Sequence, residues 1–165
     1  MIDEWIQQYG KRLYGLCLTL CADSYDADDL YQDTWLKAVK NIAQYDPNKS
    51  FEPWLTKICV NTYRNRLRHL ARSPVFDTFK TEEEKTLVME RVAAPEAEDY
   101  SQLYAAIDQL PEKLRLTVIL FYFRDMDIAS AALALDIPSG TVKSRLNKAR
   151  KLLREVLKNE TDIPF

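Results

Sequence analysis

The sequence predicts an all-α protein with two small helical modules, at residues 1–70 and 100–165, joined by a flexible acidic linker at residues 71–99. Two observations lead to this fold class. Apolar residues recur at spacings of three and four in both end segments, and glycine occurs only three times in 165 residues. This periodicity stops in the middle of the chain, where eight acidic residues face three basic ones between Ser73 and Asp99.

Three helices are predicted in the first module. The second runs from about Asp26 to Ile42, after a break and cap at Asp23 and Ser24, and the third starts near Pro53, because proline is favoured in a first helical turn. The expected inward positions are Trp5, Tyr9, Leu13, Leu16 and Leu20 in the first helix, Leu30, Trp35, Ala38, Val39 and Ile42 in the second, and Leu55, Ile58, Cys59 and Thr62 in the third. A polar stripe of Lys57, Asn61, Arg64 and Arg68 lies on another face of the third helix, and Arg66 is expected to be solvated.

A polar loop, residues 45–50, separates the second and third helices, and three aromatic residues surround it: Tyr45, Phe51 and Trp54. Exposed aromatic rings beside arginines suit unstacked bases, since stacking stabilises by roughly 1–3 kcal/mol per base. The alternative is that Phe51 and Trp54 pack in the core, which leaves Tyr45 as the better exposed candidate. The first module is therefore a candidate for binding single-stranded nucleic acid.

The second module ends in a predicted helix-turn-helix at about residues 127–150. Helical periodicity returns at Tyr100, and Pro111 starts a helix that runs through Phe123. A short helix from Asp127 to Leu135, a turn from Asp136 to Gly140 and a longer basic helix follow. The basic helix has a buried stripe of Val142, Leu146, Ala149 and Leu153 and an opposite face of Thr141, Ser144, Arg145, Lys148 and Lys151.

The net charge of −2 conceals two basic patches. From Lys143 to Lys158 there are seven cations and one acid, and from Arg64 to Arg72 there are four arginines and no acid. Such segregation indicates contact of both modules with one polyanion.

Several other classes of protein are disfavoured. Cys17, Cys21 and Cys59 show no Cys-x-x-Cys spacing and His69 is the one histidine, so we expect small buried thiols, no metal site and no cofactor. No catalytic Ser/His/Asp set or Gly-rich phosphate loop occurs, which predicts a protein that is not an enzyme. No run of eighteen apolar residues and no signal pattern is present, so a cytoplasmic location without membrane insertion is expected.

Three motifs together resemble the extracytoplasmic-function (ECF) sigma factors of bacterial RNA polymerase, within the sigma-70 family. Residues 26–38, DADDLYQDTWLKA, look like the family's polymerase-binding helix, and residues 51–65, FEPWLTKICVNTYRN, resemble the helix that reads the −10 promoter element. Residues 110–112, LPE, followed by residues 138–145, PSGTVKSR, resemble the region that reads the −35 element. Asp136 stands where the family usually has a turn glycine, which is tolerable because aspartate adopts left-handed conformations better than most residues.

The resemblance implies a partner for each motif. It places the second helix on the clamp helices of the largest polymerase subunit and the second module at the flap of the second largest. The matching polymerase-binding residues are Asp29, Gln32, Asp33 and Trp35. For capture of a flipped −10 base the candidates are Tyr45, Asn48, Lys49, Phe51, Trp54 and Asn61, with Arg64 and Arg68 on phosphates, and for the −35 duplex they are Ser139, Thr141, Ser144, Arg145 and Lys148.

The family resemblance also implies an anti-sigma factor, often membrane-anchored, as a further partner.

Some of these assignments have alternatives. Ser139 and Thr141 are alternatively caps of the basic helix, since both residue types suit an N-cap. The rival function is an autonomous helix-turn-helix regulator, which would need a dimer interface to place two reading helices one helical turn apart. An RNA-binding role for the first module alone would leave the helix-turn-helix unexplained.

Overall fold

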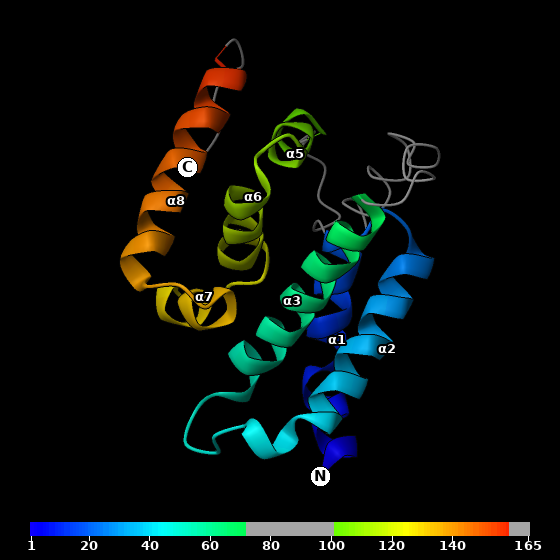
Figure 1. Ribbon diagram of the computed structural model, residues 1–165. Coiled ribbons are helices and arrows are strands. Elements are labelled where there is room, and N and C mark those ends of the chain that lie inside the picture. Colours follow the sequence, from blue (N-terminus) through cyan, green and yellow to red (C-terminus); the bar gives the residue numbers. More distant parts are fainter. Residues whose placement is uncertain (72–100, 159–165) are drawn as a thin grey trace. The chain divides into compact units, whose positions relative to one another are not determined.

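The computed structural model describes residues 1–71 and 101–158 (Figure 1). Every regular element in these two ranges is helical, which confirms the predicted all-α class. The chain divides into two compact units, called here the N-terminal unit (described residues 1–71) and the C-terminal unit (described residues 101–158). The predicted acidic linker, apart from Ala71, lies outside the described residues, so its properties stay a prediction.

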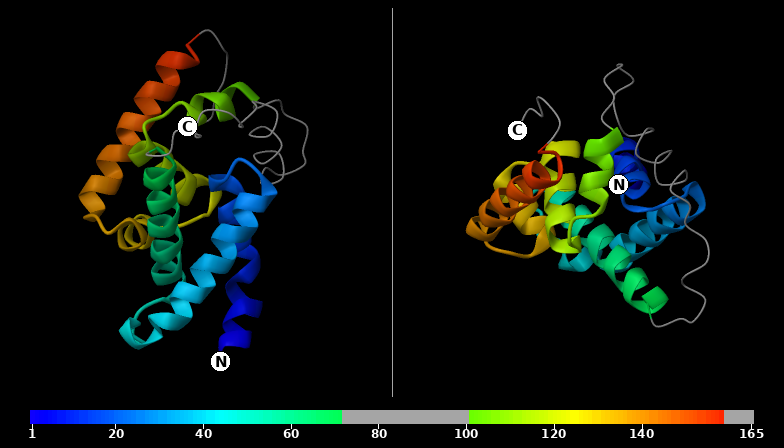
Figure 2. Two further views of the ribbon diagram at one scale, coloured as in Figure 1. Left: turned by 45° about the vertical axis from the view of Figure 1, so that its right-hand side comes forward. Right: turned by 90° about the horizontal axis from the view of Figure 1, so that it is seen from above.

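The N-terminal unit consists of α1 (Ile2–Leu20), α2 (Ser24–Lys40), a 3-10 turn η1 (Ile42–Gln44) and α3 (Phe51–Ala71). Figures 1 and 2 show α1 and α2 side by side, and α3 contacts both. The predicted cap at the start of α2 is confirmed, because the Asp23 carboxylate accepts a hydrogen bond of 2.7 Å from the backbone N–H of Asp26. α2 therefore begins at Ser24, and it ends at Lys40, two residues before the predicted Ile42.

The core of the N-terminal unit follows the predicted stripes with one clear exception. The side chains of Leu30, Leu55 and Cys59 are at most 2% exposed. Val39, expected to face inward, is 43% exposed. Because an α-helix turns by about 100° per residue, Val39 lies about 180° around α2 from Leu30, so the two cannot share a face.

The three cysteines are buried and free, as predicted for small hydrophobic side chains. The Sγ atoms of Cys17 on α1 and Cys59 on α3 are 3.8 Å apart. The hydrogen bond to Cys59 and burial raise the pKa of the Cys17 thiol far above its usual value, which keeps this thiol protonated. No group of three or more His, Cys, Asp or Glu residues that could hold a metal occurs in the part of the chain that the structure describes.

The C-terminal unit consists of α5 (Ser101–Asp108), α6 (Glu112–Val118), a π-helical turn η2 (Ile119–Phe123), α7 (Ile128–Leu135) and α8 (Ser139–Val156). α6 and η2 form the continuous helix predicted from Pro111 to Phe123, with Pro111 as its N-cap. α8 packs against α5, α6 and α7 (Figure 2). The predicted buried stripe of α8 is confirmed, since Val142, Leu146, Ala149 and Leu153 are all at most 2% exposed.

The turn between α7 and α8 depends on Asp136. Its φ of 57° and ψ of 47° are left-handed. The N–H of Ile137 donates to the carbonyl of Ala132 at 3.0 Å and the N–H of Asp136 to that of Leu133 at 3.3 Å, which is the Schellman pattern that ends a helix. The expectation that aspartate replaces glycine in the left-handed position is confirmed.

One expectation and one alternative about the start of α8 were wrong. The turn does not reach Gly140, because α8 already begins at Ser139. Pro138 is the N-cap, and no side chain caps the helix, so neither Ser139 nor Thr141 has that role. The turn ends at Pro138, two residues earlier than expected, because the fixed φ of proline suits the entry into a helix.

Candidate polymerase and nucleic-acid interfaces

One face of α2 carries the acidic residues predicted to bind polymerase. Asp29 and Gln32 are exposed and Asp33 is partly exposed, and their spacing of three and four places them on one side of the helix. Leu36, one turn further along the same face, is 64% exposed. The sequence analysis missed Leu36, although its spacing of seven from Asp29 would have placed it there. A single exposed leucine is common on protein surfaces, so it is the position of Leu36 on the acidic face, and not its exposure, that makes it a candidate for the same contact.

Trp35, assigned to the same interface, lies elsewhere. Its side chain is 7% exposed, and its ring packs against Tyr31 at 6.3 Å and Phe51 at 6.5 Å between centroids. A buried ring cannot contact a partner without unfolding the unit. The assignment of Trp35 to the polymerase surface is therefore corrected to a core position.

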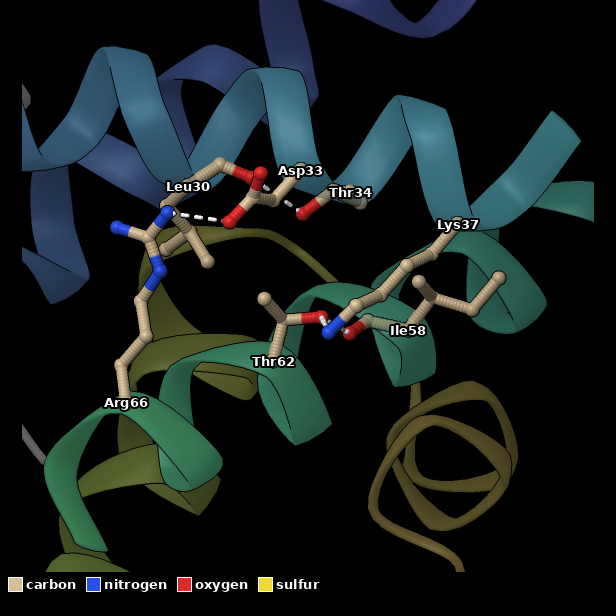
Figure 3. Close-up of polar contacts among 7 residues, drawn as sticks. All are labelled: Leu30, Asp33, Thr34, Lys37, Ile58, Thr62 and Arg66. Carbon is tan, nitrogen blue, oxygen red and sulfur yellow. Dashed lines mark hydrogen bonds and ion pairs between the residues drawn. The ribbon is translucent and has the colours of Figure 1, made fainter. Parts of the chain in front are cut away.

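The Arg66 side chain on α3 is paired rather than solvated, which corrects the expectation (Figure 3). Its Nη2 donates to Oδ2 of Asp33 at 2.6 Å. Burial lowers the pKa of Arg66, but the hydrogen bond and charge of Asp33 and the charge of Asp29 raise it more, so the net shift is upward. The acidic face of α2 thus holds an arginine of the helix predicted to read DNA.

A second polar contact joins the same two helices. The Nζ of Lys37 donates to Oγ1 of Thr62 at 3.2 Å, and that hydroxyl donates to the carbonyl of Ile58 at 2.7 Å (Figure 3).

The ion pair between Asp33 and Arg66 contributes little to stability. Because the two side chains are 46% and 30% exposed, the pair is screened by solvent and adds at most about 1 kcal/mol to stability. Its main consequence is geometric, since it fixes where the Asp33 carboxylate points.

The loop before α3 rests on a cluster of aromatic rings. Phe51 is 5% exposed and contacts five rings, at centroid distances of 4.5 Å to Trp5, 5.0 Å to Tyr9, 5.3 Å to Tyr45, 5.5 Å to Trp54 and 6.5 Å to Trp35. The alternative of core packing therefore holds for Phe51, which has no accessible face for a base. Tyr45 and Trp54 are half-buried, with centroids 5.2 Å apart. The sequence analysis missed the contribution of Trp5, which is remote from the loop in sequence.

The polar residues predicted to contact the −10 strand are accessible. Asn48 and Lys49 are exposed in the loop, and Asn61 and Arg68 are exposed on α3, with Arg64 half-buried between them. Their spacing on α3 places these three residues on one side of the helix. The N-terminal unit therefore presents an amide and a cation both at the loop and along one side of α3.

On α8, Ser139, Ser144 and Lys148 are exposed, and Thr141 and Arg145 are half-buried. The Ser144 hydroxyl donates to the carbonyl of Thr141 at 3.0 Å, so part of its hydrogen-bonding capacity is used within the helix. These five residues lie away from the buried stripe, as predicted. The arrangement is that of a recognition helix with a polar, cationic outer face.

Comparison with known proteins assigns both units. The family model described as "Sigma-70 region 2" matches residues 5–73, and that described as "Sigma-70, region 4" matches residues 100–153. The ECF RNA polymerase sigma factor EcfG of Rhodopseudomonas palustris is 30% identical over 151 residues, which cover 88% of this chain and 78% of EcfG. The chain belongs to the ECF sigma factor family.

Two further relatives extend the match along the chain. SigW of Bacillus subtilis is 28% identical over 160 residues, covering 92% of this sigma factor and 86% of SigW. SigE of Mycolicibacterium smegmatis is 30% identical over 164 residues, covering 94% of this chain. The chain spans 61% of the length of that SigE.

Two solved structures of similar fold are complexes with another protein. The sigma factor RpoE of Bartonella quintana, in complex with the anti-sigma factor NepR, matches with a TM-score of 0.72 at 23% identity, over 96% of this chain and 97% of that one. CnrH, in complex with the cytosolic domain of CnrY, matches with a TM-score of 0.71 at 21% identity, over 97% and 89%. At these identities the likeness shows a shared fold. Among the described helices, none is long and apolar enough to cross a membrane.

Proposed function

We propose that this sigma factor binds core RNA polymerase, recognises the −35 element as duplex with α8, and captures the melted −10 strand with the N-terminal unit. The observation that carries the proposal is the order of the two family matches, regions 2 and 4, each on a unit with an accessible polar face. The sigma factor itself forms and breaks no covalent bonds. Polymerase supplies the chemistry, and the sigma factor selects the start site.

The polymerase contact uses the exposed face of α2. Asp29, Gln32 and Asp33 meet the clamp helices of the largest subunit, and Leu36 adds apolar area to the same contact. The C-terminal unit is assigned to the flap of the second largest subunit. Burial of Leu36 against the partner adds hydrophobic stabilisation that the carboxylates alone do not provide.

The −10 contact uses the loop and α3. Asn48, Lys49 and Asn61 are assigned to the flipped base, and Arg64 and Arg68 to backbone phosphates. Trp54 supplies a half-buried ring beside the loop. Phe51 supports that ring from the core.

The −35 contact uses α8 in the major groove. Arg145 and Lys148 reach guanine edges or phosphates, while Ser139, Thr141 and Ser144 contact the backbone or base edges. Because polymerase and the −10 contact tether the factor, α8 need not bind tightly by itself, and no dimer is required. This feature separates the proposal from an autonomous regulator.

An anti-sigma factor is the further partner that we assign, and the cytoplasm is the assigned location. The structural relatives in complex with NepR and with the cytosolic domain of CnrY support this assignment. A membrane-anchored anti-sigma factor would hold the protein at the membrane surface.

Run-off transcription with purified core polymerase on a promoter library tests the proposal. We expect transcripts from a subset of templates with common −35 and −10 elements. The double variant Arg145→Ala/Lys148→Ala is expected to change −35 preference, by about 1–3 kcal/mol for each lost base contact, with polymerase binding intact. The control Lys113→Ala removes an exposed lysine of α6 and should leave the preference unchanged. If the folded factor yields no promoter-dependent transcript on any template, the proposal is wrong.

A further inference from the structure

The loop between η1 and α3 is closed by its own hydrogen bonds. The Tyr45 hydroxyl donates to the carbonyl of Lys49 at 2.6 Å. The Asp46 carboxylate accepts from the N–H of Asn48 at 3.0 Å, and the Asp46 carbonyl accepts from the N–H of Lys49 at 3.0 Å. Three hydrogen bonds within five residues thus fix the backbone that carries the exposed side chains of Asn48 and Lys49.

Contacts with other aromatic rings hold the ring of Tyr45 in place. It meets Phe51 edge-on with centroids 5.3 Å apart, tilts against Trp54 at 5.2 Å, and lies edge-on to Trp5 of α1 at 6.3 Å. Since Phe51 is buried, these contacts anchor the tyrosine to the core of the unit. Tyr45 therefore links a rigid aromatic cluster to the backbone of a polar loop.

We infer that Tyr45 is a positioning residue, whose hydroxyl holds Asn48 and Lys49 in the conformation that receives the unstacked −10 base. This role differs from the stacking platform expected for its ring, and it rests on the proposed capture of the −10 strand. A loop already ordered before binding loses less conformational freedom when the base arrives, so binding is tighter and more selective. The hydroxyl acts through the backbone of Lys49 and does not itself touch the base.

The substitution Tyr45→Phe separates the two roles, because it keeps the ring and removes the hydroxyl. The assay uses the full chain with core polymerase and a promoter selected from the library. It measures the ratio of transcription from that promoter to transcription from versions with single −10 substitutions. Loss of one hydrogen bond is expected to lower this ratio by about 2- to 10-fold in Tyr45→Phe. Asp46→Ala should act in the same direction, whereas Asp46→Asn should keep the ratio, because its amide oxygen still accepts from Asn48.

Tyr14→Phe is the matched control. The Tyr14 hydroxyl donates to the Asp28 carboxylate at 2.6 Å, a bond of the same length in the same unit but outside the loop. This variant is expected to keep the −10 ratio. Exchange of the backbone amide hydrogens of Asn48 and Lys49 in the free factor supplies a readout that needs no DNA, and it should become faster in Tyr45→Phe and stay unchanged in Tyr14→Phe.

The possible outcomes are distinct. A ratio that falls in Tyr45→Ala but not in Tyr45→Phe means that the ring stacks on the base, which overturns the inference. An equal fall in Tyr14→Phe points to general destabilisation and overturns it as well, as does faster loop exchange without a change in ratio. Absence of any promoter-dependent transcript from the unmodified chain overturns the proposed function first, and with it this inference.

Discussion

The two units build their proposed recognition surfaces from contacts of different range. In the N-terminal unit the loop is supported by Trp5 of α1, and Arg66 of α3 orients Asp33 of α2. In the C-terminal unit the recognition helix is set by a cap at Asp127, a left-handed Asp136 and a buried aliphatic stripe, all within about 30 consecutive residues. The first surface therefore depends on contacts between distant segments, whereas the turn that sets up α8 is local and only the packing of its buried stripe on α5 and α6 is long-range.

The largest expected effect comes from removing one core leucine in either unit. Leu30→Ala and Leu146→Ala each truncate a side chain that is at most 2% exposed, so each should lower the free energy of unfolding by about 2–5 kcal/mol. Leu30→Ala should disturb α2 and thereby weaken polymerase binding, and Leu146→Ala should disturb α8 and thereby weaken the −35 preference. Calorimetry and a polymerase pull-down measure the two consequences.

Leu36→Ala is the control for stability, because its side chain is 64% exposed and its truncation should change stability by less than about 0.5 kcal/mol. Equal destabilisation by Leu30→Ala and Leu36→Ala would contradict the assignment of the α2 faces.

A smaller effect is expected from replacing Asp136, the left-handed residue of the turn between α7 and α8. Asp136→Val places a β-branched residue at a φ of 57° and should lower the free energy of unfolding by about 1–2 kcal/mol. Asp136→Gly should stay within about 1 kcal/mol of the unmodified protein, since relief of backbone strain is offset by greater freedom in the unfolded chain. Urea unfolding measures both, and Leu133→Val, at an exposed α7 position, controls for valine in a helical backbone. If Asp136→Gly is less stable than Asp136→Val, the left-handed conformation does not determine which residues are tolerated at position 136.

The smallest expected effect is a pH dependence at the start of α7. The backbone N–H and the hydroxyl of Ser130 stabilise the Asp127 carboxylate and lower its pKa. A depressed folded-state pKa gives stability that is present above the unfolded value near 4 and lost as the pH falls through the folded value. Thermal melting between pH 6 and pH 2 should show a slightly lower melting temperature at the acidic end. The change is small because the carboxylate is fully exposed. Asp127→Asn keeps a cap that does not titrate, so an identical acid loss in this variant would rule out Asp127 as the cause.

Much of the C-terminal unit was predictable because its determinants are close in sequence. The stripe from Val142 to Leu153 follows from helical spacing alone, and the left-handed Asp136 follows from its match to the family's usual turn glycine. The start of α8 was misplaced by two residues, because Pro138 and Gly140 both suit a turn and only the structure shows which residue ends it.

The N-terminal unit was predictable as three helices, but the roles of its side chains were not. Trp35 and Phe51 carry family motifs that imply binding, yet both are buried, and the Arg66 side chain is bound to Asp33. Helical spacing gives the angle of a side chain around its own helix and contains no information on which helix lies opposite.

The sequence by itself determined the all-α class, the order of the elements, the cap at Asp23, the buried thiols and the polar face of α8. These properties depend on periodicity and on residues a few positions apart. Only the tertiary structure decided between core packing and binding for Phe51 and Trp35, and only it shows that Arg66 orients Asp33 and that the Tyr45 hydroxyl closes the loop. Each of these depends on how α1, α2, α3 and the loop approach one another in space, where packing sets which groups meet.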